Sequence, residues 1–280
     1  MIRNVVLSIL FVSGLSLLKS FSFSDKKNKI APEISYFSKK YELPNRPNTA
    51  FKEGEVLSYR LHYGIIDAGV AVLEVLPKIE EINGRKLYHI VGNGKSRSSF
   101  DWLFKVRDRY ETFFDKDALL PWFFIRRCDE GGYITNQDYL FNHYNKKVEL
   151  GGGQTMDVPV DIQDMLSSFY YARNMDFSMA QKGDVFSISS VVDKQIWLLK
   201  IKYAGKETID TDLGQFRCLK FVPIIQTGRV FKHEEDLSVW ITDDMNHIPL
   251  RARAKILVGS IKMDITSMQN IANPLAKEGK

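Results

Sequence analysis

Hydrophobic and polar residues alternate along four separate stretches of this chain. Residues 57–63 and 261–266 carry apolar side chains at every second position, and residues 199–203 and 250–256 do the same. Successive side chains of a β-strand leave it on opposite faces, so strict alternation predicts one buried face and one solvated face. Strands of this kind are typical of antiparallel sheets that are wet on one side.

Turn signals separate these apolar runs at short intervals. Asn83 and Gly84 form one such signal, and the glycine-containing segments 204–206 and 212–214 are two more. Roughly a dozen or more strand candidates at this spacing are typical of sandwiches and barrels. We therefore predict a mainly β fold, a curved antiparallel sheet of barrel-like or half-barrel form.

One segment departs from the two-residue period and predicts one short amphipathic helix. Between residues 161 and 173 an apolar stripe follows helical spacing, formed by Ile162, Met165, Leu166, Phe169 and Tyr170. Asp161 is the expected N-cap, because its carboxylate can accept the free backbone N–H groups of a first turn. A helix this short is marginal in isolation, so we expect its stripe to dock on the sheet.

The N-terminal residues have the layout of a secretory signal. Arg3 precedes an apolar run over residues 5–18, and small residues then lead to a charged cluster. That run is shorter than the roughly 20 residues that cross a bilayer, so no stable transmembrane segment should remain after cleavage. The expected divisions are a signal peptide (1–24), a polar linker or arm (25–50), a single β-rich domain (51–270) and a polar tail (271–280).

Composition and net charge limit the classes of partner that this protein is expected to bind. A hydrophobic content of 44% and an aromatic content of 12% support a packed core. The formal charge of +5 is mild for 280 residues and does not call for nucleic acid. The expected location is periplasmic or secreted, where lipid, glycan or another envelope protein is a compatible partner.

No sequence motif indicates a metal site or a cofactor site. The five histidines fall in no HxH or HExxH spacing. Residues 94–96 read Gly-Lys-Ser, but a phosphate loop needs a glycine at position 89, which is His. We therefore predict no metal and no cofactor, assign no catalytic residue, and favour a protein that is not an enzyme while leaving the question open.

Two cysteines leave two alternatives of equal weight. Cys128 and Cys218 permit one disulfide in an exported chain. The alternative is two free, buried thiols on separate strands. The sequence does not decide between them.

Cations and aromatic side chains gather between residues 102 and 126 and provide the binding-site candidates. These are Arg107, Arg109, Tyr110, Trp102, Trp122 and Arg126. Cations beside aromatic rings could hold an anionic head group over an apolar surface. An ordinary solvated strand face, covered by the apolar stems of its long side chains, is the alternative that we favour.

A second cluster contains Trp240, Asp243, Asp244 and Pro249. Paired carboxylates can serve acid–base catalysis. The neighbouring asparagine and proline are instead typical of a turn, in which aspartates bond backbone N–H groups. We favour the structural turn. Arg173, at the end of the predicted helix, is expected to cap the last carbonyls or to reach a carboxylate such as Asp243.

Four landmarks together carry a family resemblance. They are residues 51–59 followed by Gly64, Ala68 and Gly69; residues 164–173; residues 214–218; and residues 240–244 followed by 248–251. Their order and spacing over about residues 51–268 resemble the domain-of-unknown-function family 3108 of bacterial envelope proteins. The resemblance implies an exported β-rich domain of barrel-like or half-barrel form. It implies no established activity and supplies no catalytic residues.

Three functions fit these observations, in the following order. The first is an exported envelope protein that binds or carries an amphipathic ligand, a lipid or glycolipid, in its curved sheet. The second is an envelope assembly or structural factor without a small ligand. The third is a glycan hydrolase that uses carboxylates such as Asp243 and Asp244, which would then face each other across a cleft.

Overall fold

Alternating side chains form strands where the sequence predicts them. β1 (Val56–Tyr63) buries Leu57, Tyr59 and Leu61 and leaves its polar residues partly exposed. Its antiparallel neighbour β15 (Ser260–Gln269) shows the same alternation. These stretches from opposite ends of the chain pair because each has one apolar face for the same core.

The structure is a computed structural model that describes residues 42–224, 236–255 and 259–278. The predicted signal peptide (1–24) and the first part of the predicted linker (25–41) lie outside the described residues. The other strands are β2 (Ile66–Val75), β3 (Glu80–Ile82), β4 (Arg85–Ser96), β5 (Val106–Asp115), β6 (Pro121–Glu130), β7 (Tyr133–Asn142), β8 (Lys147–Glu149), β9 (Thr155–Asp157), β10 (Val185–Val192), β11 (Gln195–Thr211), β12 (Gly214–Pro223), β13 (Leu237–Thr242) and β14 (Pro249–Lys255). The helices of the described residues are α2 (Ser98–Phe104) and α3 (Met165–Arg173).

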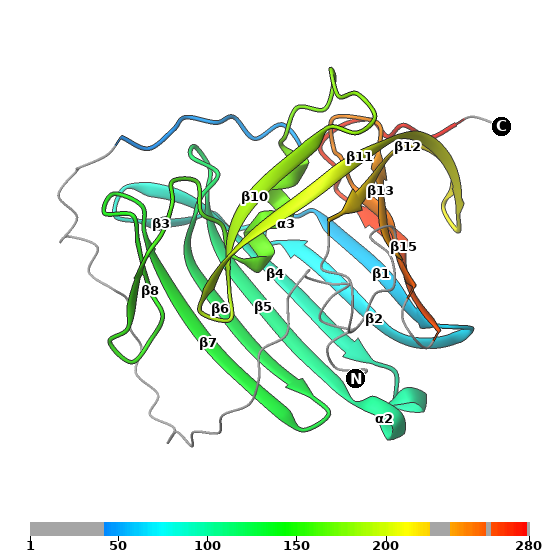
Figure 1. Ribbon diagram of the computed structural model, residues 1–280, viewed down its shortest axis with the longest axis horizontal. Helices are drawn as coiled ribbons and strands as arrows, with labels where there is room; N and C mark the ends of the chain where they lie inside the picture. The colour runs from blue at the N-terminus through cyan, green and yellow to red at the C-terminus, as the bar shows by residue number, and fades with distance from the viewer. Residues whose placement is uncertain (1–41, 225–235, 256–258, 279–280) are drawn as a thin grey trace.

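The strands form one antiparallel sheet. Their order is β10-β11-β12-β13-β14-β15-β1-β2-β4-β5-β6-β7-β8-β9, with β3 paired to β4. The sheet curves, and α3 packs inside it against β5 and β10 (Figure 1). β9 and β10 end this order, and no ladder joins them in the described part of the chain, so the sheet is open. The predicted mainly β, half-barrel fold is confirmed.

Two of the predicted turns are confirmed and one is wrong. Asn83 and Gly84 both have positive φ and connect β3 to β4, and residues 212–213 connect β11 to β12, which begins at Gly214. The segment 204–206 is no turn, because β11 continues through it. Gly205 lies there with φ +110° at a shift of register against β12. Its missing Cβ permits the local bulge.

The sequence predicted one helix, and the described residues form two. The predicted helix is present as α3, whereas α2 was not predicted. α2 has seven residues and no side-chain hydrogen bond at its N-cap, Arg97. It is held instead by Phe100, which is buried. Tertiary packing therefore forms a helix that carries no capping signal in the sequence.

The chain segments flanking the sheet are packed against it. Before β1, the backbone N–H of Arg46 donates to the carbonyl of Asp117 (2.6 Å), and Ala50 is fully buried. After β15, the backbone N–H of Arg217 donates to the carbonyl of Ala276 (3.0 Å). Parts of the predicted arm and of the predicted tail thus add to the β-rich body.

Candidate functional site

The position of α3 is fixed at its start by a buried aspartate. Asp164 is the N-cap, and its Oδ1 accepts hydrogen bonds from the backbone N–H groups of Leu166 and Ser167 (both 2.7 Å). Thr112 of β5 donates to the other carboxylate oxygen (2.5 Å). Burial raises the pKa of Asp164 to about 6. The prediction that Asp161 is the N-cap is wrong. The chain makes a left-handed bend at Asp161 (φ +63°), and the helix begins at Met165.

The other end of α3 is fixed by a buried ion pair. The guanidinium of Arg173 donates to both carboxylate oxygens of Glu55 (2.6 and 2.8 Å). It also donates to the carbonyls of Asn246 (2.9 Å) and Ala50 (3.1 Å). The expected partner Asp243 is therefore replaced by Glu55, which is fully buried. Removing either charge would leave the other buried and unpaired, so this pair holds α3 in one orientation.

An apolar cavity lies between α3 and the C-terminal half of the sheet. Its volume is about 470 Å³. Most of its walls are aliphatic or aromatic, including Met165, Phe169, Phe177, Ile188, Leu199, Ile201, Phe221, Val239, Ile241 and Met263. Ile196, Leu198 and Ile224 also line it and are exposed, so the cavity opens to solvent there. Its size falls within the roughly 300–1,000 Å³ of ligand pockets.

Few polar groups line this cavity. The indole Nε1 of Trp197 is buried and has no hydrogen-bond partner among the described residues. The ring Nδ1 of His247 lies 2.7 Å from the carbonyl of Arg173 and must carry the proton, because a carbonyl only accepts. Burial lowers the pKa of His247, so the ring is neutral and its Nε2 is an acceptor. Two serine hydroxyls also line the cavity: Ser168 donates to the carbonyl of Asp164 (2.6 Å) and lies 3.1 Å from the hydroxyl of Ser190. The lining thus offers the Trp197 N–H as a donor and the His247 Nε2 as an acceptor, while Arg173 is occupied by Glu55.

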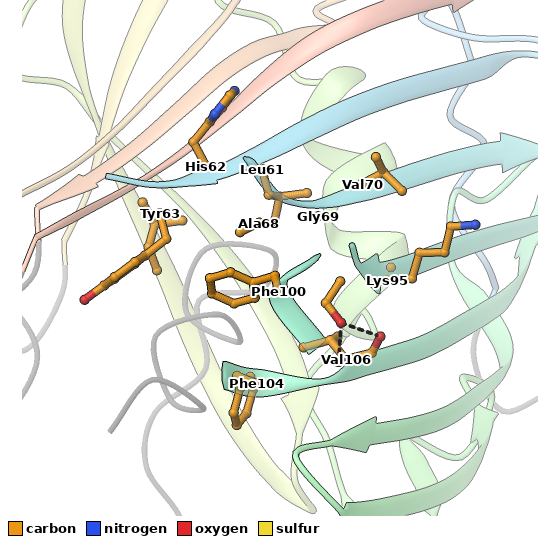
Figure 2. Close-up of a pocket in the computed structure, with 13 residues that line it drawn as sticks. Leu61, His62, Tyr63, Ala68, Gly69, Val70, Lys95, Phe100, Phe104 and Val106 are labelled. Carbon is orange, nitrogen blue, oxygen red and sulfur yellow. Dashed lines mark hydrogen bonds between the residues drawn. The ribbon is translucent and has the colours of Figure 1, made fainter. Parts of the chain in front are cut away.

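A second, much smaller pocket lies beneath α2. Its volume is about 50 Å³, and its walls include Phe100 and Phe104 of α2, Leu61 of β1 and Val106 of β5. Figure 2 shows the Phe100 ring in the space between these strands and the Phe104 ring beside the start of β5. A space of this size holds water molecules but no lipid chain. The larger cavity is therefore the candidate ligand site.

The structure divides the candidate residues of the sequence between two faces of the sheet. Arg107 and Arg109 point to solvent, where Arg107 pairs with Asp101 (2.7 Å) and Arg109 with Glu111 (2.8 Å). Tyr110 lies on the opposite, buried face, because neighbouring residues of a strand alternate. The guanidinium of Arg126 lies 5.6 Å from the ring centre of Tyr110.

The two tryptophans of that set are also separated. Trp102 is on α2 and 83% exposed. Trp122 is buried in β6, where its Nε1 donates to Asp115 (2.9 Å). The structure therefore brings Tyr110 and Arg126 together, whereas Trp102 and Trp122 lie apart from that pair, on α2 and at the start of β6.

The buried pair Tyr110 and Arg126 belongs to a polar cluster inside the sheet. Arg126 donates to Asp193 (2.8 Å), and Asp108 and Glu130 lie buried on the same two strands, β5 and β6. Burial raises the pKa of Asp108 to about 6 and that of Cys128 to about 11. A thiol with such a pKa is protonated at neutral pH, so Cys128 is no nucleophile here.

The cysteines are free. Cys128 and Cys218 are both buried, on β6 and β12, and they belong to two different core clusters. A disulfide would require Cα atoms within about 7 Å of each other. The structure therefore shows the alternative of two buried thiols on separate strands.

The cluster around residues 240–249 forms the β13–β14 connection. Asp244 accepts hydrogen bonds from the backbone N–H groups of Asn246 (2.9 Å) and Ala276 (2.7 Å). Asp243 pairs with Lys206 (2.8 Å), and the indole of Trp240 donates to Glu207 (3.0 Å). Pro249 begins β14. Each aspartate is thus engaged in holding the connection.

The fold and the cavity define an open, barrel-like antiparallel β protein with an internal apolar site. The chain belongs to the family of proteins of unknown function DUF3108, whose model matches residues 58–266. This confirms the resemblance drawn from the four sequence landmarks. A search of curated proteins finds no match.

Solved structures support the same fold class. The chain is similar to the β-barrel-like DUF1849 protein from Brucella abortus, with 11% identity, a TM-score of 0.52, and coverage of 80% of this chain and 100% of that chain. A DUF1089 family protein from Pseudomonas aeruginosa has 10% identity and a TM-score of 0.27, covering 81% and 95% of the two chains. Lipoprotein LppX from Mycobacterium tuberculosis has 13% identity and a TM-score of 0.16, covering 79% and 89%. Only the first score supports a shared fold.

The described helices do not include a membrane span. Neither α2 nor α3 is long and apolar enough to cross a bilayer. In the described part of the chain, no group of three or more His, Cys, Asp or Glu side chains has the arrangement of a metal site.

Sequence reasoning missed the residues of the cavity. Trp197 and Leu199 lie on β11, Ile188 lies on β10 and Val239 lies on β13. Alternation along β11 was visible in the sequence, and it correctly placed Leu199 and Ile201 on one face. No sequence signal indicated which strands stand opposite that face.

Proposed function

We propose that this protein is an exported envelope protein that binds an amphipathic ligand, a lipid or glycolipid, in the cavity between α3 and strands β10–β15. The observation that carries the proposal is the cavity itself, about 470 Å³ in volume and lined mainly by apolar side chains. Side chains normally fill protein interiors densely, so an open apolar space of this size favours a ligand. The signal-like start of the chain supports the exported location.

The polar groups of the cavity indicate the chemistry of the ligand head. Arg173 makes both of its strong contacts to Glu55 and is not available to a carboxylate or phosphate. Trp197 offers a hydrogen-bond donor, and neutral His247 offers an acceptor. A head group with uncharged hydroxyl or amide groups would satisfy both. We therefore propose a ligand with an apolar chain and a neutral polar head.

The test is to identify what the protein carries. The chain is expressed with its own N-terminal segment, purified gently after export, and extracted with organic solvent for mass spectrometry beside a mock purification. We expect an amphiphile in stoichiometric amount. Folded protein with a clean extract would contradict the proposal and favour an assembly factor.

A matched pair of variants links the ligand to the cavity. Ala172 lines the cavity and is only half-buried, so Ala172→Phe fills part of the space without crowding the core. Met179→Phe adds a ring at an exposed position that does not line the cavity. We expect the first variant to lose the amphiphile and the second to retain it. Equal ligand content in both folded variants would place the ligand elsewhere.

A further inference from the structure

One edge of the sheet displays large apolar side chains to solvent. The β1–β2 turn, α2 and the β6–β7 turn lie along this edge (Figure 1). We call their exposed apolar residues the α2 rim, which consists of Ile65, Ile66, Trp102, Leu103, Tyr133 and Ile134. Ile65 is completely exposed, and Trp102 and Ile134 are 83% and 68% exposed. Exposed apolar residues that gather on one edge mark an interaction surface.

Backbone hydrogen bonds join the three parts of the rim. At the first residue before α2, the N–H of Arg97 donates to the carbonyl of Ala68 in β2 (2.9 Å). At the first residue after α2, the carbonyl of Lys105 accepts from the N–H of Gly131 in the β6–β7 turn (2.7 Å). The helix therefore bridges the two turns, and the rim is one platform.

The helix presents its apolar residues in two opposite directions. Phe100 and Phe104 line the small pocket beneath α2, together with Leu61 (Figure 2). Trp102 and Leu103 remain on the outer side and are exposed. The inward rings anchor the helix, so the outward residues are held in place against solvent.

The charges around the rim are balanced or positive. Arg97 pairs with Asp67 (2.8 Å), Arg107 with Asp101 (2.7 Å) and Lys105 with Asp129 (3.8 Å). Lys95, at the end of β4, is exposed and has no ion-pair partner among the described residues. Each of these three carboxylates is thus compensated, and Lys95 adds an exposed cation. Such a border is compatible with the phosphates of lipid head groups.

We propose that the α2 rim docks on the surface of a lipid bilayer, with Trp102 and the two isoleucines of the β1–β2 turn entering the interface. Tryptophan and tyrosine favour the boundary between head groups and acyl chains, and apolar residues flanked by cations bind such surfaces. The apolar residues sit at turns and on a short helix instead of on a broad flat face, which suits shallow insertion better than a protein interface of standard size. The inference goes beyond ligand binding and does not rest on the cavity.

The test uses vesicles of phosphatidylethanolamine and phosphatidylglycerol and the chain purified after export. We expect the protein to sediment with the vesicles. Trp102→Ala combined with Ile65→Ser should lower the partition coefficient by about tenfold or more, because membrane affinity scales with buried apolar area. Met245→Ser is the matched control: Met245 is 58% exposed in the β13–β14 connection, at the opposite edge of the sheet. It should bind like the unaltered protein.

Brominated lipids identify the inserting residue. None of the four tryptophans lies in residues 1–41, so quenching by bromine in the acyl chains reports on the β-rich body even if the N-terminal segment is retained. Trp102→Phe should keep vesicle binding and lose most of the quenching. Failure of the unaltered protein to sediment, equal binding of the double variant, or unchanged quenching in Trp102→Phe would each overturn the proposal. Ligand content measured on the same samples is an independent result.

Discussion

Two buried charged residues fix α3, and they do so differently. Arg173 is paired with Glu55 and surrounded by backbone acceptors, so its charge is compensated inside the protein. Asp164 accepts hydrogen bonds but has no cationic partner in direct contact in the part of the chain that the structure describes. Burial therefore disfavours its charged form, and the pKa rises to about 6. Stability should depend on pH through Asp164 and not through the arginine, which stays protonated.

We predict that Asp164→Asn reduces the pH dependence of stability. The folded-state pKa is raised from 3.8 to about 6, so the folded protein binds this proton more tightly than the unfolded chain. The stabilisation is present at pH below 4 and is lost as pH rises through 6, by about 3 kcal/mol in total. Asparagine is an equally good N-cap and does not titrate. Urea unfolding at a series of pH values should give a flatter curve for the variant.

Two other buried groups contribute to the slope that remains in Asp164→Asn. Burial raises the pKa of Asp108 to about 6, which acts in the same direction as Asp164, and lowers the pKa of His143 to about 4, which acts in the opposite direction. Asp164→Ala serves as the comparison, since it removes the cap as well as the charge and should lose about 1 kcal/mol or more at low pH. Parallel curves for the unaltered protein and Asp164→Asn would show that Asp164 titrates normally in the fold.

At the scale of elements, the sequence predicted the strands and the helix that carry a regular hydrophobic pattern within their own residues. Alternation over residues 57–63 and 261–266 predicted β1 and β15, and helical spacing predicted α3. α2 could not be predicted, because its N-cap position is an arginine that makes no side-chain cap. Its stability comes from two phenylalanine rings placed over strands distant in sequence. The bulge at Gly205 was mistaken for a turn because both use glycine at positive φ.

We predict that Gly131→Ala loosens α2 more than Gly132→Ala does. A Cβ at Gly131 would lie 2.7 Å from the ring of Phe104, whereas a Cβ at Gly132 would have nothing within 4 Å. Both residues have positive φ, so each substitution costs about 1 kcal/mol in backbone strain. The additional clash in Gly131→Ala should cost about 1 kcal/mol more. Urea unfolding measures the difference, and hydrogen exchange should show faster opening of α2 in Gly131→Ala alone.

At the scale of the whole molecule, the candidate site depends on strand order. The cavity joins Met165 of α3 to Met263 of β15, and its walls come from strands spread between them in the sequence. Alternation indicates that Leu199 lies on the buried face of its strand. Only the strand order β10-β11-β12-β13-β14-β15 shows which residues stand opposite that face. The cations of β5 stood out in the sequence because charge is visible residue by residue. An apolar cavity has no such local signal, since its residues resemble those of any core.

We predict that the bound amphiphile stabilises the entire domain. The cavity walls belong to α3 and to the C-terminal half of the sheet, which unfold together if the domain is cooperative. A ligand that binds only the folded state adds about 2.7 kcal/mol at a concentration one hundred times its Kd. For a domain of this size, that corresponds to a rise in Tm of about 5–10 °C. Thermal melting should therefore show a lower Tm after delipidation and recovery when a neutral-headed amphiphile is added back.

Ala172→Phe should show no recovery, because the ring occupies the space that the ligand needs. Recovery of equal size in this variant would mean that the amphiphile acts at another surface.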